Sequence, residues 1–274
     1  EVYAYYVPNG DYYDVYFLAN GKICWPKNSK ELFYPMSQLK TVDTSNLSTA
    51  KVEDMTDTFY NCKNLVSIDV SHWDVSNVKS MYGTFCACNK LETLDTKNWD
   101  TGNVTSLRFA FYGCGALTGL DVSGWDLGNV TDLYATFFNC GKLEQLDVSD
   151  WDTSAVTTLG HTFRGCAQLK EIDASNWNTG NVTAMQNLFM DCKSLETLKV
   201  AGWDASKVTD MTSTFRGCLN LKELDVSKWD TGNVTTLLAT FQDLPKIETV
   251  DISDWNVSKV TNMKQLFNRC TSLQ

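Results

Sequence analysis

The stretch Val104–Asn129, VTSLRFAFYGCGALTGLDVSGWDLGN, is one copy of a unit that fills most of this chain. The unit recurs every 26 residues without an insertion, and every copy opens on a valine: Val52, Val78, Val104, Val130, Val156, Val182, Val208, Val234 and Val260. A degenerate earlier copy is recognisable between Phe33 and Leu47. Repeats of about 20–50 residues are the sequence signature of stacked architectures. The period therefore decides the fold.

The first half of this copy has the apolar spacing of a short helix. Its apolar residues follow one another at intervals of three and four, which predicts one helical face: Val104, Leu107, Phe111, Cys114 and Leu117. Asn103 and Thr105 offer oxygens for an N-cap, and Gly113 suits the C-terminal end of a helix.

The second half has the alternation of a strand. Leu120 and Val122 point to one side, whereas Asp121 and Ser123 point to the other, which predicts a short strand. Trp125 follows, and then a turn at 126–129 in which Asp126 can accept backbone N–H bonds as an Asx turn.

A strand and a short helix cannot bury their apolar sides alone, but stacked copies make a continuous core. The period and the L-x-x-L-x-V pattern lie in the leucine-rich-repeat range. We therefore expect an α/β solenoid, a leucine-rich-repeat-like array of 26-residue strand–helix repeats. One tryptophan per copy should form a ladder in its core: Trp73, Trp99, Trp125, Trp151, Trp177, Trp203, Trp229 and Trp255.

The N-terminal residues differ from the repeats. Three β-rich runs, VYAYY, DYYDVYFLA and KICW, are separated by hairpin turn signals at Pro8–Gly10 and Asn20–Gly21. We expect a β-hairpin or meander that caps the first repeat. The predicted domains are 1–51, an N-terminal β cap with the degenerate first repeat, and 52–274, a solenoid of nine Val-led copies with the last one partial. Because the last copy is incomplete, we expect the natural protein to continue beyond Gln274.

Composition limits the possible partners. The net charge of -10 argues against nucleic acid and against an anionic membrane surface. No apolar run approaches the ~20 residues of a membrane span. Eight of the ten cysteines share the 26-residue register, which favours free thiols that act as small buried hydrophobes: Cys62, Cys88, Cys114, Cys140, Cys166, Cys192, Cys218 and Cys270. The spacing leaves open a disulfide between Cys24 and Cys86.

Catalysis is not expected. The two histidines, His72 and His161, lie in different phases of the repeat, which denies them the contact that a shared catalytic site needs. Cys86-Ala87-Cys88 has no histidine in register and is not a zinc pattern. Phosphate-binding and dinucleotide-binding motifs are missing from the sequence. We therefore predict a protein that is not an enzyme and has no cofactor.

The strand face carries a row of aspartates that recurs with the repeat: Asp43, Asp69, Asp95, Asp121, Asp147, Asp173, Asp225 and Asp251. In most copies a serine follows two residues later. One interpretation is structural, with each carboxylate accepting bonds from a serine hydroxyl or a backbone N–H. The alternative is a row of Ca²⁺ sites, because carboxylate and hydroxyl oxygens suit that ion. Lys199 replaces aspartate in one copy, where it can interrupt a run of like charges between Asp173 and Asp225.

The outer side of the predicted helices carries the candidate protein-binding residues, which are aromatic in the early copies only: Tyr60, Tyr82, Phe109, Tyr112, Tyr134 and Phe138. Later copies hold residues such as Arg164 and Met190 at the same position. A scaffold does not require this uneven distribution, and exposed aromatic clusters mark interaction sites. The alternative is that these rings pack sideways between neighbouring helices or under the N-terminal cap.

The recurring string M-x-x-T-F-x-x-C-x-x-L-x-x-L-D-V-S-x-W-D-T-G-N-V-T closely resembles the 26-residue bacterial surface-protein repeat, a BspA-like leucine-rich repeat. One copy runs from Met211 to Cys218 and continues from Leu221 to Trp229. The resemblance covers about residues 52–274. It implies display on the bacterial cell surface, as in mycoplasma lipoproteins and lactobacillus surface proteins, with adhesion reported for some members. The family has no fixed functional motif, and this chain has Trp where ordinary leucine-rich repeats have their Asn ladder.

These observations lead to one functional expectation and two alternatives. We expect a non-catalytic, extracellular module, lipoprotein or cell-wall anchored, that binds a surface or matrix protein of a host or a neighbouring cell. We do not expect this chain to bind nucleic acid or to insert into a membrane. The alternatives are a passive spacer that displays another domain and a Ca²⁺-binding surface repeat.

Overall fold

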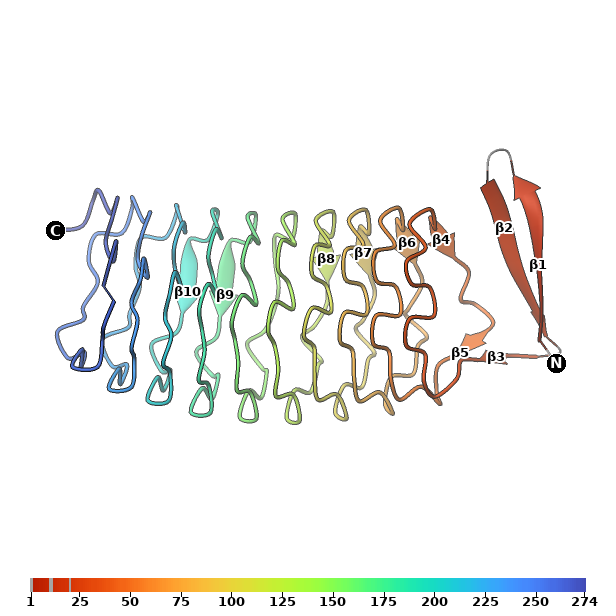
Figure 1. Cartoon of the computed structure of the whole chain (residues 1–274), viewed down its shortest axis with the longest axis horizontal. Helices are drawn as coiled ribbons and strands as arrows, with labels where there is room; N and C mark the ends of the chain where they lie inside the picture. The colour runs from red at the N-terminus through yellow and green to blue at the C-terminus, as the bar shows by residue number, and fades with distance from the viewer. Residues whose placement is uncertain (1, 10–11, 20) are drawn as a thin grey trace.

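The computed structural model describes residues 2–9, 12–19 and 21–274 of the chain. The repeats form a long stack in which the chain winds once per copy, with the N-terminal hairpin at one end and the C-terminus at the other (Figure 1). No helix occurs in these described residues. The predicted strand–helix α/β solenoid is therefore wrong, and the fold is a repeating β-rich stack of coils.

The strands are few and, after the hairpin, very short. The antiparallel hairpin consists of β1 (Val2–Asn9) and β2 (Tyr12–Ala19). The other strands are β3 (Ile23–Cys24), β4 (Thr41–Val42), β5 (Leu47–Ser48), β6 (Ser67–Ile68), β7 (Thr93–Leu94), β8 (Gly119–Leu120), β9 (Glu171–Asp173) and β10 (Thr197–Lys199). They pair in parallel as β3–β5, β4–β6, β7–β8 and β9–β10.

The N-terminal hairpin stands at the first end of the stack (Figure 1). Strand β3 does not extend this hairpin but pairs with β5, which follows it by one coil. The turns predicted at Pro8–Gly10 and Asn20–Gly21 each include a residue, Gly10 and Asn20, that lies outside the described part of the chain.

The segment predicted as a helix is a series of tight turns. Alternate backbone N–H groups donate to carbonyls of the next coil: Leu107 to Asp132, Phe109 to Tyr134, Phe111 to Thr136 and Gly113 to Phe138. The N–H groups between them donate to the carbonyl three residues earlier: Ala110 to Leu107, Tyr112 to Phe109 and Cys114 to Phe111. Half of the donors therefore stabilise the turns of one coil, and the other half join it to its neighbour.

Two residues of each copy have positive φ, which a right-handed helix cannot contain. In the quoted copy they are Phe109, with φ 57°, and Gly113, with φ 73°. The same two positions have positive φ in the other Val-led copies, as at Asp57 and Asn61. Successive turns also bring every third or fourth residue to the inside. The apolar spacing therefore fitted these turns as well as it fitted a helix.

The distance between coils explains why helices are excluded. One residue per copy forms a parallel β-bridge to its equivalent in the next coil, in an unbroken row: Asn28, Asp54, Ser80, Ser106, Asp132, Thr158, Ala184, Asp210, Thr236 and Asn262. Paired strands lie ~4.8 Å apart, whereas a helix with its side chains is ~10 Å wide. Because this row and the strand side both keep the β spacing, the stack is straight and has no room for one helix per coil.

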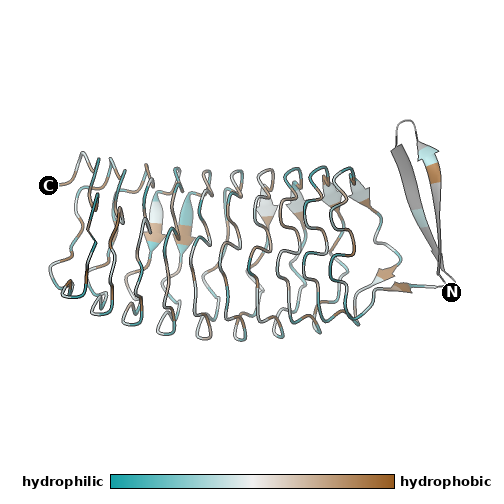
Figure 2. Cartoon of the chain, viewed as in Figure 1, coloured by the Kyte–Doolittle hydropathy of each residue, from teal (hydrophilic) through white to brown (hydrophobic). Residues whose placement is uncertain are grey.

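The core is the one that the apolar pattern predicts. Trp125 is 3% exposed, and Phe111 and Leu120 are 1% and 6% exposed. The tryptophans stack in a ladder, with 5.8 Å between the ring centroids of Trp151 and Trp177. The phenylalanines form a second ladder beside it. In β9 and β10 the central residue is apolar between more hydrophilic neighbours (Figure 2).

The cysteines in register form a third ladder of free thiols, as predicted. The thiol of Cys88, for example, donates to the carbonyl of Phe59 in the preceding coil, with 3.2 Å between Sγ and O. Cys24 and Cys86 are free as well, so the disulfide that the spacing left open does not form. Finally, nothing in the described residues is a helix long and apolar enough to cross a membrane.

Candidate functional site

The aspartate row on the strand face is bonded within each coil. The carboxylate of Asp69 accepts the backbone N–H of Ser71 at 3.0 Å and its hydroxyl at 2.6 Å. The same pair of bonds recurs at Asp121, Asp147, Asp173, Asp225 and Asp251. The serine bonds lower the pKa of Asp121 and Asp251. These contacts support the structural interpretation of the row.

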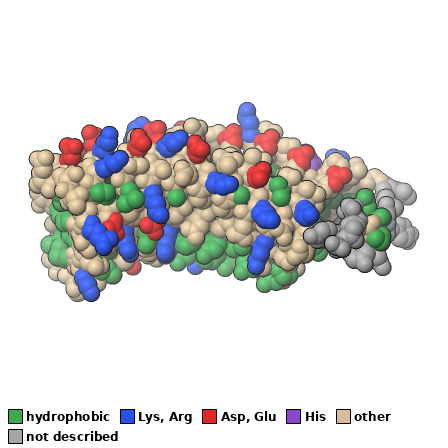
Figure 3. Space-filling view, turned by 90° about the horizontal axis from the view of Figure 1, so that it is seen from above, with side chains coloured by type: hydrophobic (Ala, Val, Ile, Leu, Met, Phe, Trp, Pro, Cys, Tyr) green, Lys and Arg blue, Asp and Glu red, His purple; other side chains and the backbone are tan. Residues whose placement is uncertain are grey.

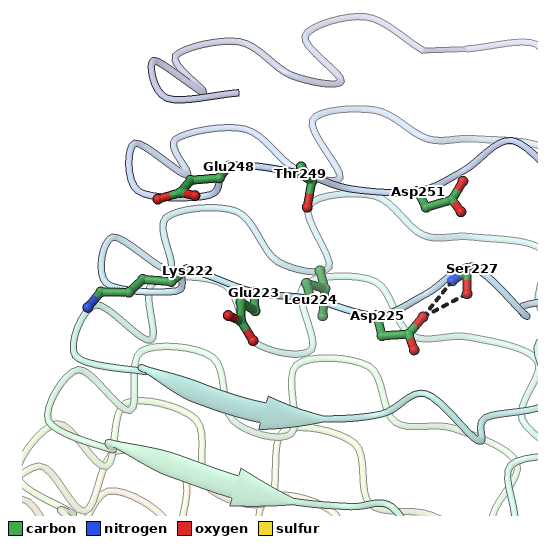
Figure 4. Close-up of a pocket in the computed structure, with 8 residues that line it drawn as sticks. All are labelled: Lys222, Glu223, Leu224, Asp225, Ser227, Glu248, Thr249 and Asp251. Atoms are coloured by element: carbon green, nitrogen blue, oxygen red, sulfur yellow. Dashed lines mark hydrogen bonds between the residues drawn. The ribbon is translucent and has the colours of Figure 1, made fainter. Parts of the chain in front are cut away.

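The described residues of the strand face show no cluster of metal-ligating side chains. Within the described residues, no group of three or more His, Cys, Asp and Glu side chains is placed to hold one. Carboxylates run along the length of the stack, with lysines and arginines among them (Figure 3). A hollow of about 510 Å³ between two coils is lined by polar side chains such as Glu223, Asp225 and Asp251, and Ser227 binds Asp225 there (Figure 4).

The six candidate aromatic residues lie on the turn segments of four successive coils. We call Tyr60, Tyr82, Phe109, Tyr112, Tyr134 and Phe138 the aromatic strip. Each of them is half-buried. The rings therefore pack across neighbouring coils, which is the alternative that the sequence left open, while each keeps part of its surface open to solvent.

Phe109 lies at the centre of this strip. Its ring centroid lies 5.6 Å from those of Tyr82, Tyr112 and Tyr134, in edge-to-face contacts. Tyr112 in turn stacks on Phe138, with 4.5 Å between the centroids. Five of the six predicted residues are thus brought into one cluster.

Tyr60 lies at the N-terminal end of the strip. It stacks on Tyr34 of the preceding coil, with 5.0 Å between the ring centroids. The buried Cys86 occupies the equivalent position between Tyr60 and Tyr112, so the ring column is interrupted there. Tyr34 is 46% exposed, which adds an open ring to this end of the strip.

The backbone at Phe109 is strained. Its φ of 57° is uncommon for a residue other than glycine and is an outlier for a bulky side chain. The equivalent position in other copies holds Gly83, Ala135 or Asn187, which tolerate this conformation at similar or lower strain. Every Val-led copy has positive φ at this position, so the scaffold sets the conformation but does not require an aromatic residue there.

Sequence reasoning missed three members of the cluster. The guanidinium of Arg108 lies 4.1 Å from the ring centroid of Tyr134, and that of Arg164 lies 5.0 Å from Phe138. His161 packs against Tyr134, with 5.1 Å between the ring centroids. Arg164 follows Phe138 by one period, and His161 follows Phe109 by two periods. Extending the aromatic register by one coil would have found both.

The two histidines lie apart, as their repeat phases indicate. Nε2 of His72 is 2.7 Å from the carbonyl oxygen of Thr44 on the strand side of the coil. His161 is half-buried among the rings, where burial and the charge of Arg164 lower its pKa.

The chain matches the family described as "Mycoplasma protein of unknown function, DUF285" over residues 27–120, 105–199 and 196–274. The chain belongs to this family. The three matches are consecutive and together cover nearly all of the stack. The chain is thus a DUF285 repeat protein, an organisation consistent with a module that interacts with other proteins.

Two further comparisons concern the DUF285 chain. No curated protein matches it significantly. Among solved structures it is similar to a leucine-rich-repeat protein of Leptospira interrogans, at 12% sequence identity and a TM-score of 0.32. That match covers 87% of this chain and 65% of the Leptospira chain, so the DUF285 chain spans less than two thirds of that protein.

Proposed function

We propose that this chain is a non-catalytic module of a bacterial surface protein, and that its aromatic strip binds a protein on a host or neighbouring cell. The observation that carries the proposal is Phe109, a bulky residue at positive φ whose ring lies at the centre of the cluster. Aromatic and arginine side chains are enriched where proteins contact one another.

The uneven distribution of the strip supports this proposal. The coils share one hydrogen-bonded frame from end to end, whereas the aromatic residues of the turn face gather in the early coils. Gly160 occupies the position of Tyr82 and Tyr134, three coils after the first and one coil after the second, so the frame forms without a side chain there. The rings are therefore an addition to the frame, of a kind that binding explains.

The location outside the cell is part of the proposal. It is supported by the close resemblance of the repeat to bacterial surface-protein repeats, which also suggests attachment as a lipoprotein or to the cell wall. The free thiols do not oppose it, because all eight thiols in register lie inside the stack or partly inside it.

A passive spacer is the second candidate. The regular ladders of Trp, Phe and Cys favour it, because they stabilise a straight stack of any length without a ligand. The rival proposals differ in one measurable respect, since a spacer has no partner of its own.

The test is the binding of labelled chain to host cells and to a panel of purified matrix proteins. Tyr82→Ala combined with Tyr134→Ala should weaken binding about tenfold or more. The matched control is Thr212→Ala combined with Leu238→Ala, which changes the same position in later coils and should bind as the wild type does. Binding that survives in the tyrosine variant would exclude the aromatic strip as the binding surface. If the wild type binds nothing, the passive spacer is favoured.

A further inference from the structure

Three of the four arginines in the chain are paired with a carboxylate. Nη1 of Arg108 lies 3.3 Å from Oδ2 of Asp132. Nε of Arg216 lies 3.7 Å from Oδ2 of Asp243, and Nη1 of Arg269 lies 3.4 Å from Oδ1 of the same residue. Within the described residues, which include all four arginines, Arg164 has no such ion pair. Carboxylates are not scarce in this chain, since it has 33 Asp and Glu against 23 Lys and Arg.

Arg164 is nevertheless held in place at the end of the aromatic strip. Its guanidinium lies over the ring of Phe138, 5.0 Å from the centroid, and its Nη1 is 3.5 Å from Nδ1 of His161. On its other side, Nε2 of His161 is 3.3 Å from Nδ2 of Asn187. These neighbours orient the guanidinium but carry no negative charge, and no carboxylate of the described residues lies within ion-pair distance of Arg164.

This geometry suits a carboxylate that arrives with a ring. The planar guanidinium presents a fork of N–H donors that matches a carboxylate, and a half-buried setting strengthens the pair relative to water. The rings beside it offer contact area to an aromatic or large aliphatic side chain. Arg108, the other cation of the cluster, is already paired with Asp132. A single negative charge therefore fits this site better than a phosphate, for which several cations would be needed.

We propose that Arg164 and the adjoining rings of Phe138 and Tyr134 bind a polypeptide segment in which an Asp or Glu lies next to an aromatic or large apolar residue. This inference rests on the proposed function and specifies the chemistry of its partner. The carboxylate binds Arg164, and the neighbouring side chain packs on the strip.

The experiment is a selection from a displayed library of random seven-residue peptides on the full chain. We expect the recovered peptides to be enriched in Asp or Glu beside Phe, Tyr, Trp or Leu. A recovered peptide is then synthesised in its acidic form and with Asn or Gln in place of the acid. Its affinity is measured by fluorescence polarisation.

Arg164→Gln should weaken binding of the acidic peptide about tenfold, and so should the amide form of the peptide on the wild type. Glutamine fits this position, because Gln242 occupies it in another coil. Arg216→Gln, at the same position but next to Asp243, is the matched control and should bind as the wild type does. Unchanged thermal unfolding of each variant shows that the frame is intact.

The outcomes separate this inference from the proposed function. Peptides that need Tyr82 and Tyr134 but show no acidic preference would overturn the role of Arg164 and leave the strip as a binding surface. Peptides that bind equally to the Tyr82→Ala, Tyr134→Ala variant would overturn both, and so would a selection that recovers none above background.

Discussion

Lys199 Nζ lies 2.6 Å from Oδ2 of Asp173 in the preceding coil, and 4.0 Å from a carboxylate oxygen of Glu171. Lys199 stands where most other copies have an aspartate. It therefore places a cation inside a row of carboxylates and joins two coils through their side chains. The contact also lowers the pKa of Asp173 to about 2, with the Lys199 hydrogen bond as the main cause and the Ser175 bonds next.

Lys199→Asp should lower the midpoint of thermal unfolding, and the effect should be larger at low salt than at high salt. The new carboxylate would lie between Asp173 and Asp225, and Ala201 cannot supply the serine hydroxyl that supports the other aspartates. The control is Lys228→Asp, which removes a longer and more exposed contact of 3.6 Å to Asp254 and should have a smaller effect. A midpoint that rises in Lys199→Asp would contradict the claim that Lys199 stabilises the fold by interrupting the row of aspartates.

The ion pair of Lys199 and Asp173 also makes the stability of the fold depend on pH. Because the folded pKa of Asp173 is depressed to about 2, below the ~3.9 of an unfolded chain, the pair stabilises the fold fully above pH ~4. This contribution is lost as the pH falls through the folded pKa. The wild type should therefore unfold at a higher temperature than Lys199→Met at pH 6, and the gap should close towards pH 2. A gap that stays constant across this range would exclude the pair as its source.

The apolar pattern predicted the core but not the backbone that carries it. Val104, Leu107 and Phe111 are buried as a helix would have required, because tight turns and helices both bring every third or fourth residue inside. The clue to the difference lay in Gly113 and its equivalents, which are often Gly, Asn or Asp. A residue type that tolerates positive φ once per copy is the sign of a repeated turn rather than of one helix end.

Gly165→Ala tests this backbone. Gly165 has φ 74°, and a Cβ there would clash with Oδ1 of Asn139 in the preceding coil. The substitution should lower the free energy of unfolding by about 1–2 kcal/mol in denaturant titrations, from the left-handed conformation alone. Gly119→Ala is the control, because no atom lies within 4 Å of its Cβ position and its φ is not positive. Equal stability of the two variants would contradict the turn geometry.

The candidate site was predictable in part, because some of its residues depart from the repeat pattern. Aromatic residues confined to early copies were visible as departures from the repeat, and five of the six proved to be in contact. Arg108 lies one period after Tyr82 and Arg164 one period after Phe138, so the register could have found both, and only their contact with the rings depended on side-chain direction. The strain at Phe109 was invisible as well, since φ follows from the turn that the helical interpretation had excluded.

Thiol reactivity should divide the cysteines by burial. Burial raises the pKa of Cys62 to about 11 and that of Cys166 to about 12, so these ladder thiols hold little reactive thiolate near neutral pH. Cys24 is exposed and Cys270 is half-buried. Iodoacetamide at pH 8 should therefore modify Cys24 first and Cys270 more slowly, as read by peptide mass spectrometry. Modification of all ten cysteines in denaturant is the control, and rapid labelling of Cys166 in the folded chain would contradict the buried ladder.

Two tryptophans in the ladder lack the hydrogen bond that the other Val-led copies make. Nε1 of Trp151 donates to the carbonyl of Val122 at 3.1 Å, and the same bond recurs in five further copies. Within the described residues, Nε1 of Trp73 and Trp125 has no partner. The residues whose carbonyls would accept these bonds are Thr44 and Thr96, where the bonded copies have Val or Ala. The hydroxyls of both threonines donate to the backbone carbonyl of an aspartate in the next coil, a bond that Val and Ala cannot make.

Thr96→Val should therefore stabilise the fold, although it removes a hydrogen bond. A buried donor without a partner costs about 1–3 kcal/mol, whereas a satisfied hydroxyl contributes about 1 kcal/mol. Valine lets the backbone of residue 96 adopt the arrangement found at Val122, so that its carbonyl accepts Nε1 of Trp125. The expected gain is about 1 kcal/mol in the free energy of unfolding, together with slower hydrogen exchange of that indole N–H in NMR spectra. Thr101→Val is the control, because its hydroxyl bond of 2.8 Å to the Asp126 carbonyl is lost with no tryptophan bond gained. A loss of stability in both variants would show that the threonine hydroxyl, and not the indole, governs this part of the ladder.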